Sequence, residues 1–429
     1  MKVLMFGWEF PPHISGGLGT ACFGLTKGMA FNNIEVIFVV PKAFGDEDQR
    51  AVRIVSADQQ TINLFDAQFQ EYWKHLTYLE VSSLLVPYMS PEEFRRLTDV
   101  SEHDYTDIKE SVFAENFTFT GAYGPDLFKE VSRYALVATK IAKEYTHDII
   151  HAHDWLTFPA GVAAKHASGK PLFVHVHATE FDRSGEHINP QVYEIERQGM
   201  LFADRVIAVS NRTRQVIIDK YGIAPEKVVT LHNAVTMGVT QYDRDANPLD
   251  DKIVTFLGRI TFQKGPEYFV EAAKKVLDVD PNIRFVMAGT GDMWQRMVEL
   301  VAKLRIGHKF HFAGFLNGAE VKKMFDMSSV YVMPSVSEPF GISPLEAMQS
   351  NVPVIISRQS GVSEVLNHAI KVDFWDIDAM ADAIYALLHY QGISKMFARM
   401  GHEEVENLKW DNVAFKLKEI YQAVLDARS

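Results

Sequence analysis

The sequence predicts an α/β protein of two doubly wound, Rossmann-like domains that face a cleft. Strand-like apolar runs alternate with helical patterns along most of the chain, and this series starts a second time in the second half. The chain has 429 residues, which is too long for one ordinary core. Ligands of open parallel sheets bind beyond the carboxyl ends of the strands, so we expect functional residues at strand ends in both domains.

The apolar runs define the expected strands in chain order. In the first half the runs are KVLMFGW (2–8), IEVIFVV (34–40), HDIIHAH (147–153), PLFVHVHA (171–178), DRVIAVS (204–210) and KVVTLHN (227–233). In the second half they are KIVTFLGR (252–259), IRFVMAG (283–289), KFHFAGF (309–315), VYVMPS (330–335), VPVIIS (352–357) and AIKVDF (369–374). Loops or helical patterns separate these runs, which favours parallel strands joined by helices.

A polar segment without clear periodicity, residues 236–250, separates the two series and is predicted to be a linker. It divides the chain into an N-terminal domain (1–235) and a C-terminal domain (251–408). The last segment, 409–429, has apolar residues at helical spacing. We expect it to form a C-terminal helix that packs back on the N-terminal domain.

Residues 44–120 interrupt the alternation of strands and helices. This segment is long, polar and rich in aromatic residues. It predicts a helical elaboration with a small core of its own. The alternative is an acceptor-binding wall, because aromatic faces stack on sugar rings.

Composition excludes some classes of function. The formal net charge of −12 argues against a nucleic-acid partner, which requires an electropositive face. The single cysteine, Cys22, has no partner for an internal disulfide, and a large chain without cross-links is typical of reducing compartments. The N-terminus does not read as a secretory signal, and no apolar run approaches the roughly 20 residues of a membrane span. We therefore expect a cytoplasmic protein without an integral membrane segment.

The stretch SEPFGISPLEAMQ (337–349) places Glu338 and Glu346 eight positions apart, around a glycine turn. Two carboxylates in this arrangement can face a common polar ligand. The same letters also form a capping box, with the Ser343 hydroxyl on a helix amide, Pro344 at the first helical position and Glu346 reaching back. Taken alone, the stretch favours the capped helix.

The stretch FLGRITFQKG places Arg259 and Lys264 five positions apart, directly after the first strand of the C-terminal domain. Two cations at a strand end suit a diphosphate. The Arg guanidinium can donate two parallel hydrogen bonds to phosphate oxygens, and the Lys ammonium acts as a point charge. They would also stabilise the negative charge on a leaving group. The alternative is a pair of solvated surface cations.

A glycine-rich turn, PPHISGGLGTA, follows the first strand and contains Gly16, Gly17 and Gly19. Glycines at a turn before a helix let backbone amides approach an anion closely. The spacing differs from the dinucleotide fingerprint, so no nicotinamide cofactor is expected. Tight packing is the alternative role of these glycines.

Two His-x-His pairs end strands of the N-terminal domain, His151 with His153 and His175 with His177. Both members of such a pair face one side of a strand, so a metal site that also includes Asp154 is an alternative. That alternative implies a metal-dependent hydrolase. We favour His177 as a hydrogen-bonding group at the cleft, His151 and His153 as structural residues, and no metal.

Taken together, the motifs resemble those of family 4 glycosyltransferases of the two-domain GT-B type, especially the glycogen or starch synthase-like members. The matching pieces run from residue 15 to 366 and are GGLG, HAHDW, HVHATE, GRITFQKG, SEPFGISPLEAMQ and SGVSEVL. The resemblance implies a retaining, metal-independent hexosyltransferase without a cofactor. It also implies that the C-terminal domain binds a nucleotide sugar and the N-terminal domain lies on the acceptor side.

The same resemblance implies roles for individual residues in the C-terminal domain. Arg259 and Lys264 hold the donor diphosphate, Glu338 contacts hydroxyls of the transferred sugar, and Glu346 accepts hydrogen bonds from the ribose. The donor site is completed by backbone amides of Phe340, Gly341, Ile342, Gly361 and Val362.

In the N-terminal domain, Gly16 and Gly17 are expected against the diphosphate and the acceptor side. His177 is expected to meet the transferred sugar, and it completes the expected catalytic set of His177, Arg259, Lys264 and Glu338. The resemblance further implies a front-face displacement, in which the leaving phosphate helps to deprotonate the acceptor hydroxyl.

The main hypothesis is transfer of glucose from ADP- or UDP-glucose to the non-reducing end of an α-1,4-glucan. One alternative is a family 4 transferase that acts on a cell-surface polysaccharide, a glycolipid or a small disaccharide. Another is a sugar-nucleotide sensor that binds the donor without turnover.

Overall fold

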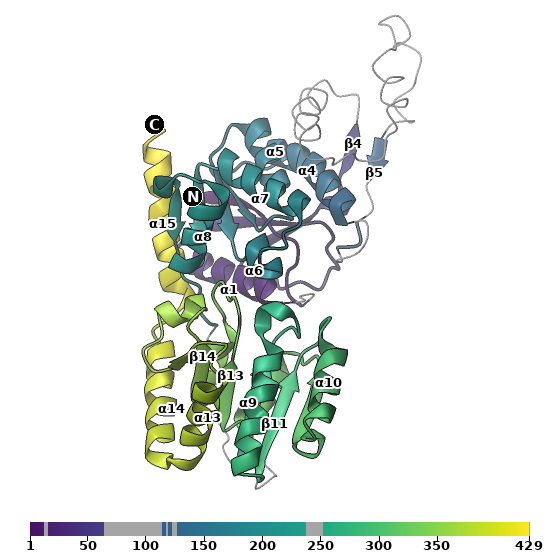
Figure 1. Cartoon of the computed structure of the whole chain (residues 1–429). Helices are drawn as coiled ribbons and strands as arrows, with labels where there is room; N and C mark the ends of the chain where they lie inside the picture. The colour runs from purple at the N-terminus through teal and green to yellow at the C-terminus, as the bar shows by residue number, and fades with distance from the viewer. Residues whose placement is uncertain (13–15, 64–113, 117–118, 122–126, 237–251, 429) are drawn as a thin grey trace, which may run out of the picture.

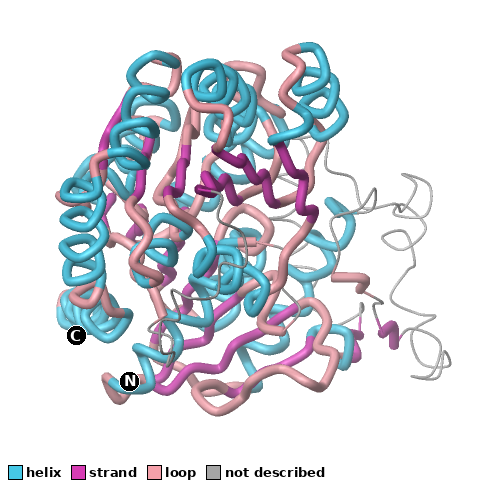
Figure 2. The backbone as a smooth tube through the Cα atoms, turned by 90° about the horizontal axis from the view of Figure 1, so that it is seen from below, coloured by secondary structure: helices cyan, strands magenta, loops and turns pink. Residues whose placement is uncertain are grey.

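Two parallel sheets, each with helices on both faces, form the upper and lower domains in Figure 1 and confirm the predicted fold class. Figure 2 shows the helices around the strands of these sheets. The computed structural model describes the chain except for residues 13–15, 64–113, 117–118, 122–126, 237–251 and 429.

The N-terminal domain contains a seven-stranded sheet of order β3-β2-β1-β6-β7-β8-β9. All neighbouring strands are parallel. The strands are β1 (Lys2–Phe6), β2 (Glu35–Val40), β3 (Arg53–Ser56), β6 (Ile149–His153), β7 (Leu172–Val176), β8 (Arg205–Ala208) and β9 (Val228–Thr230). Every apolar run predicted in the first half contains one of these strands.

The segment 44–120 contributes more to the sheets than expected. Its residues Arg53–Ser56 form β3, the edge strand of the main sheet, where we expected a helical elaboration. Two short strands, β4 (Thr61–Asn63) and β5 (Ala114–Asn116), form a separate antiparallel pair. Most of the aromatic-rich remainder, and nearly all of the predicted linker, lies outside the described residues.

Alternate residues of the N-terminal sheet face two separate hydrophobic cores. One face packs against α4 (Leu127–Glu144), α5 (Phe158–Ser168), α7 (Pro190–Phe202) and α8 (Asn211–Tyr221). The other face packs against α1 (Gly17–Phe31) and α15 (Trp410–Asp426). The short helix α6 (Glu180–Ser184) lies beyond the end of β7.

The C-terminal domain contains a six-stranded parallel sheet of order β12-β11-β10-β13-β14-β15. The strands are β10 (Lys252–Leu257), β11 (Ile283–Ala288), β12 (Phe310–Gly314), β13 (Val330–Met333), β14 (Val354–Ser357) and β15 (Ile370–Val372). One face packs against α9 (Pro266–Val279), α10 (Trp294–Lys303) and α13 (Ile377–His389). The other packs against α11 (Gly318–Met327), α12 (Ser343–Gln349) and α14 (Gln391–Val405).

The C-terminal helix α15 returns to the N-terminal domain and lies against α1 (Figure 1). The close approach depends on two glycines of α1. A Cβ on Gly24 would lie 2.1 Å from Trp410 Nε1, and one on Gly28 would lie 2.4 Å from the Trp410 carbonyl oxygen. Lys418 also donates from Nζ to the Asn32 carbonyl at 2.8 Å. The two ends of the chain therefore build one core.

Candidate active site

The carboxyl ends of the two sheets face each other across the contact between the domains. Ser337, which follows β13, donates from Oγ to Oδ1 of Asp182 in α6 at 2.6 Å. The chain order reverses between β1 and β6 in one sheet and between β10 and β13 in the other. Ligands of open parallel sheets bind at such reversal points. The residues that follow these strands therefore form the candidate site.

Lys264 and Glu338 meet at the reversal point of the C-terminal sheet. Lys264 ends the short 3-10 helix η4 (Phe262–Lys264) after β10, and Glu338 follows β13. The Lys264 Nζ lies 2.5 Å from Glu338 Oε2, which also accepts from Ser335 Oγ at 3.2 Å. Glu338 is only 6% exposed, so these side chains rather than bulk water surround its carboxylate.

Arg259 lies at the same strand end but does not contact Glu338. Its guanidinium is exposed, and among the described residues its Nη2 donates only to Gln263 Oε1, at 3.4 Å. No described carboxylate pairs with it. The two expected cations thus occupy one strand end, where Lys264 is paired and Arg259 remains available to an anion.

Glu346 is half-buried in α12 and makes no side-chain hydrogen bond or ion pair with any other described residue. Burial raises the pKa of Glu346 from 4.5 to about 7. Burial also raises the pKa of Tyr331, and the charges of Glu338 and Glu346 add to that effect. The charges of both carboxylates thus act on the Tyr331 hydroxyl.

The expected capping box is absent from this helix. The N-cap residue is Ile342, and no side-chain hydrogen bond caps the helix. Ser343 is already the first helical residue, and its Oγ accepts from the Tyr331 hydroxyl at 2.8 Å. Glu346 does not reach back to the first turn.

The loop before α12 has three successive backbone amides, of Phe340, Gly341 and Ile342, that donate to no described residue. Gly341 has φ 100°, and a Cβ there would lie 3.1 Å from Glu338 Cγ, so the turn requires glycine. The other two amides expected in the donor site, of Gly361 and Val362, already donate to carbonyl oxygens within the domain. Gly361 N donates to Glu338 O and Val362 N to Phe340 O, both at 2.8 Å.

His177 directly follows β7, at the carboxyl end of the N-terminal sheet. Its backbone amide donates to Asp154 Oδ1 at 2.6 Å, and Asp154 follows β6 with φ 59°. Burial lowers the pKa of His177 to about 3, so the imidazole is neutral at pH 7. Burial raises the pKa of Asp154 to about 7, although the Arg183 guanidinium opposes this shift. Asp154 therefore holds the strand end that carries His177, a role that we did not predict.

The two His-x-His pairs form a ladder of four imidazoles on the face covered by α1 and α15. His153 Nδ1 lies 2.9 Å from His177 Nε2, and His151 Nε2 lies 3.3 Å from His175 Nδ1. His151 Nδ1 lies 2.5 Å from the hydroxyl of Tyr421 in α15. Ring contacts of His153 with His151 and His175 join the two hydrogen-bonded sets, so the ladder connects the C-terminal helix to the strand end that carries His177.

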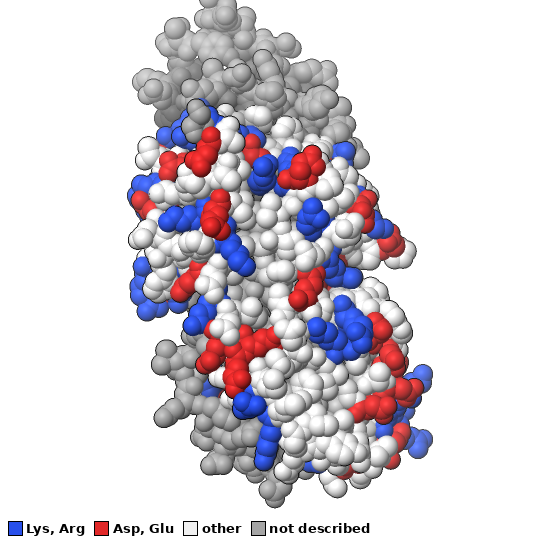
Figure 3. Space-filling model, turned by 90° about the vertical axis from the view of Figure 1, so that its left-hand side faces the viewer, with Lys and Arg blue, Asp and Glu red and all other residues white. Residues whose placement is uncertain are grey.

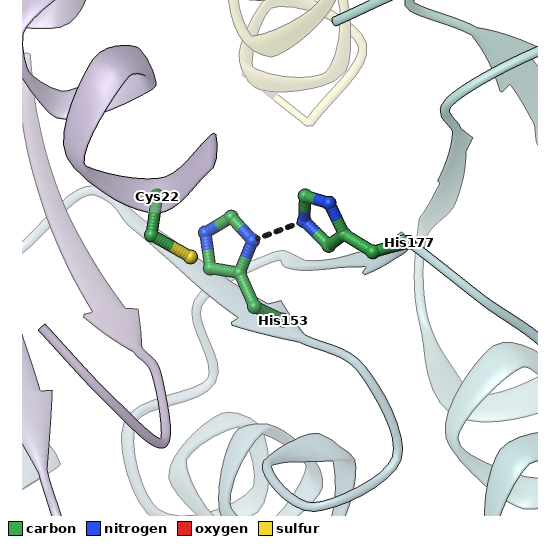
Figure 4. Close-up of side chains that lie close together, drawn as sticks. All are labelled: Cys22, His153 and His177. Carbon is green, nitrogen blue, oxygen red and sulfur yellow. Dashed lines mark hydrogen bonds between the residues drawn. The ribbon is translucent and has the colours of Figure 1, made fainter. Parts of the chain in front are cut away.

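Two sets of side chains in this region have ligand atoms within 4.8 Å of one another and could hold a metal ion. One set is Cys22, His153 and His177 (Figure 4), and the other is His151, His153 and His175. The His153 Nδ1 and the His177 Nε2 share a hydrogen bond, so neither of these two nitrogens is free for a metal ion while that bond persists. The observed pairing of the imidazoles favours hydrogen-bonding roles.

The glycine turn of the N-terminal domain has open space beside it. Gly16 precedes α1 in an extended conformation, and no atom of the described residues lies within 4 Å of a Cβ built on Gly16 or Gly17. The Glu9 Oε1 already accepts from the Gly19 amide at 3.2 Å. A carboxylate in this first turn disfavours a second anion, so the C-terminal domain is better suited to a diphosphate.

On the face shown in Figure 3, basic and acidic side chains of the described residues are interspersed. A broad positive surface is the feature that nucleic-acid binding requires. Separately, none of the described helices is both long and apolar enough to cross a bilayer.

Two family descriptions of glycosyltransferases match consecutive parts of the chain. Residues 104–238 match the family Glycosyltransferase Family 4, and residues 240–404 match Glycosyl transferases group 1. The second match contains Lys264, Glu338 and Glu346.

Individual relatives are similar over nearly the full length. An uncharacterized glycosyltransferase of Methanocaldococcus jannaschii is 27% identical, with 99% of both chains covered. The glycogen synthase of Mycobacterium tuberculosis is 22% identical and covers 99% of this chain and 95% of its own. The crystal structure of Anabaena HepE in complex with UDP and glucose has a TM-score of 0.70 at 15% identity, with 99% and 100% of the two chains covered.

Proposed function

We propose that this chain, a glycosyltransferase of the GT-B fold, transfers glucose from ADP- or UDP-glucose to the non-reducing end of an α-1,4-glucan with retention of configuration. The observation that carries the proposal is the Lys264–Glu338 pair at the reversal point of the C-terminal sheet. The similarity to a glycogen synthase supports a glucan acceptor, and the likeness to HepE with UDP and glucose supports the donor class.

Donor binding then requires an exchange of partners at Lys264. In the free protein its ammonium is paired with Glu338. A donor diphosphate would take the ammonium as a stronger anionic partner, with Arg259 beside it. The released Glu338 carboxylate would accept hydrogen bonds from hydroxyls of the sugar, and Glu346 would accept from the ribose.

The transfer itself needs no enzymic nucleophile. The bond between the sugar C1 and the diphosphate oxygen breaks, and the acceptor oxygen forms a bond to C1 on the same face. The proton of the acceptor hydroxyl passes to the departing phosphate oxygen. Lys264 and Arg259 stabilise the charge that develops on that phosphate.

His177 supports this reaction as a hydrogen-bonding group. With a pKa of about 3 its imidazole does not serve as a proton-donating acid at pH 7. Its Nε2 faces His153, and its backbone is held by Asp154. The side chain is thus fixed in orientation, which suits contact with a sugar hydroxyl.

The donor and acceptor classes are tested with radiolabelled ADP- and UDP-glucose and three acceptors: glycogen, a lipid extract and inositol phosphate. Incorporation into glycogen supports the proposal. Incorporation only into lipid or only into a small acceptor rejects the glucan acceptor and favours the alternative transferases. Donor binding without turnover on any acceptor favours a sensor.

Stereochemistry and metal dependence are tested on the same reaction. The NMR signal of the anomeric proton, recorded at early times, should show that the new linkage has the α configuration, as in the donor. Activity should persist after treatment with EDTA. A β product, or activity restored only by a divalent metal, would reject this mechanism and favour a role for the histidine cluster as a metal site.

A further inference from the structure

Glu364 of the C-terminal domain reaches across to the N-terminal domain. It ends the 3-10 helix η6 (Gly361–Glu364). Its Oε2 accepts from the Asn211 amide and its Oε1 from the Arg212 amide, both at 2.8 Å. Its Oε2 also lies 2.8 Å from His232 Nε2. All three partners belong to the N-terminal domain.

The amides bound by Glu364 are the first two of helix α8. The third amide, of Thr213, is capped within the N-terminal domain by Ser210 Oγ at 3.0 Å. The first amides of a helix have no intrahelical partners, and the positive end of the helix dipole favours an anion there. Burial opposes ionisation of Glu364, but these hydrogen bonds outweigh it and lower the pKa of its carboxyl.

The turn that carries Glu364 is bonded to the loop that carries Glu338. Glu338 N donates to Gln359 O at 3.1 Å, and Gly361 N donates to Glu338 O at 2.8 Å. A Cβ on Gly361 would lie 2.0 Å from Pro339 O and 2.8 Å from Ser210 Oγ. The turn is therefore confined between the Glu338 loop and the start of α8.

The neighbours of Glu338 in the chain also make contacts between the domains. Ser337 Oγ donates to Asp182 Oδ1 at 2.6 Å on one side. On the other side Thr213 Oγ1 donates to Pro339 O at 3.4 Å. Glu338 thus lies between two hydrogen bonds to the N-terminal domain, so its position depends on how the domains sit together.

We propose that Glu364 is a positioning residue. By binding the start of α8 it holds the domains in the arrangement that places the Glu338 loop against the N-terminal domain. The inference rests on the proposed function, because the geometry at stake is that of the transferred sugar. Without Glu364 the donor still meets Lys264 and Arg259, but its sugar is not aligned with the acceptor side.

The chain offers a matched control in Glu404. Its carboxylate accepts from the amides of Asn367 and His368, at 2.8 and 2.9 Å, and lies 3.1 Å from His368 Nδ1. These partners resemble those of Glu364, but all of them belong to the C-terminal domain. A purely structural role predicts similar consequences for both substitutions.

The test compares Glu364→Ala and Glu404→Ala by steady-state kinetics, thermal unfolding and small-angle scattering of the free protein. We expect Glu364→Ala to lower kcat by about 10- to 100-fold, the order expected for a misplacement of about 1 Å. The donor KM should stay within about threefold, because a positioning residue acts on the transition state. The radius of gyration should increase. Glu404→Ala should lower the unfolding temperature without changing kcat or the radius of gyration.

Glu364→Gln keeps the size of the side chain and removes one acceptor, so it provides a well-folded second variant with an intermediate loss of kcat. Equal effects of the Glu364 and Glu404 variants on kcat would overturn the inference, and so would an unchanged radius of gyration in Glu364→Ala. If the wild-type protein transferred no sugar, the proposed function would fail, while the scattering comparison would still decide the role of Glu364.

Discussion

The Lys264 ammonium lies 2.5 Å from the Glu338 carboxylate, although 74 positions separate the two residues in the chain. The sheet explains their meeting, because β10 and β13 are neighbours and each residue follows the carboxyl end of its strand. The pair holds two opposite charges at the place where a diphosphate and a sugar would need them. Each member can therefore be tested separately.

Replacing Lys264 by Ala should lower kcat by about 100-fold or more, because a preorganised charge is lost at the leaving phosphate. Steady-state kinetics with the nucleotide sugar measure this effect. Lys275→Ala is the matched control, since Lys275 forms an exposed ion pair with Asp378 in the same domain, at 2.5 Å. Equal rates in the two variants would remove Lys264 from the site.

Replacing Asp154 by Ala should release the His177 amide and lower kcat by about 10- to 100-fold, since small displacements of a contact group are costly. Asp204→Ala is the control, because Asp204 accepts from the Leu172 amide at 2.8 Å, at the opposite end of β7. Kinetics and far-UV circular dichroism should be measured together. A loss of the same size in Asp204→Ala would indicate a general effect on the strand.

The raised pKa of Glu346 predicts a pH dependence of stability. Between pH 4.5 and about 7 the folded state keeps a proton that the unfolded state has lost, so this group makes folding less favourable as pH rises. The unfolding temperature of Glu346→Gln relative to wild type should therefore increase across that window and level off above about pH 7. A constant difference from pH 4 to 8 would contradict the shift.

Donor binding should also release a proton from Glu346, since ribose hydroxyls favour the ionised carboxylate. Calorimetry near pH 6 in two buffers of different ionisation enthalpy measures the released protons. The wild-type protein should show buffer-dependent heats, and Glu346→Gln should lose most of this dependence. Identical proton release from the variant would place Glu346 outside the ribose contact.

Replacing Gly24 by Ala should destabilise the protein by about 1–3 kcal/mol, the usual cost of overpacking a core. The added methyl group would collide with the Trp410 indole and displace α15. Gly392→Ala in α14 is the control, because nothing lies within 4 Å of a Cβ there. Denaturant unfolding measures both. Equal stability of the two variants would mean that α15 does not need the close approach to α1.

The hydrophobic runs allowed the strands to be predicted well, because parallel strands buried on both faces read as continuous apolar segments. The edge strand β3 was missed since its segment is polar at one end and lies in an aromatic-rich stretch. The expected capping box is absent because the helix begins at Ser343, and the Ser343 hydroxyl accepts from Tyr331, a residue of the preceding strand. Local patterns do not reveal which distant side chain reaches a cap.

In the candidate site, too, the residues could be predicted from the local sequence, but the contacts between distant segments could not. Lys264 and Glu338 could be predicted because both are charged residues that follow predicted strands. Asp154 carried a signal as well, directly after a histidine pair, but its backbone contact with His177 depends on the pairing of β6 and β7. Glu364 lies in the SGVSEVL stretch, but its contacts could not be predicted, because its partners lie in the other domain.

The central claim is that Lys264 binds the diphosphate and Glu338 binds the sugar of one donor. Calorimetric affinities of nucleoside diphosphate and of nucleotide glucose for wild type, Lys264→Ala and Glu338→Gln test it most directly. Lys264→Ala should weaken both ligands, whereas Glu338→Gln should weaken only the nucleotide glucose. Equal loss of both ligands in Glu338→Gln, or undiminished binding of both in Lys264→Ala, would contradict the account.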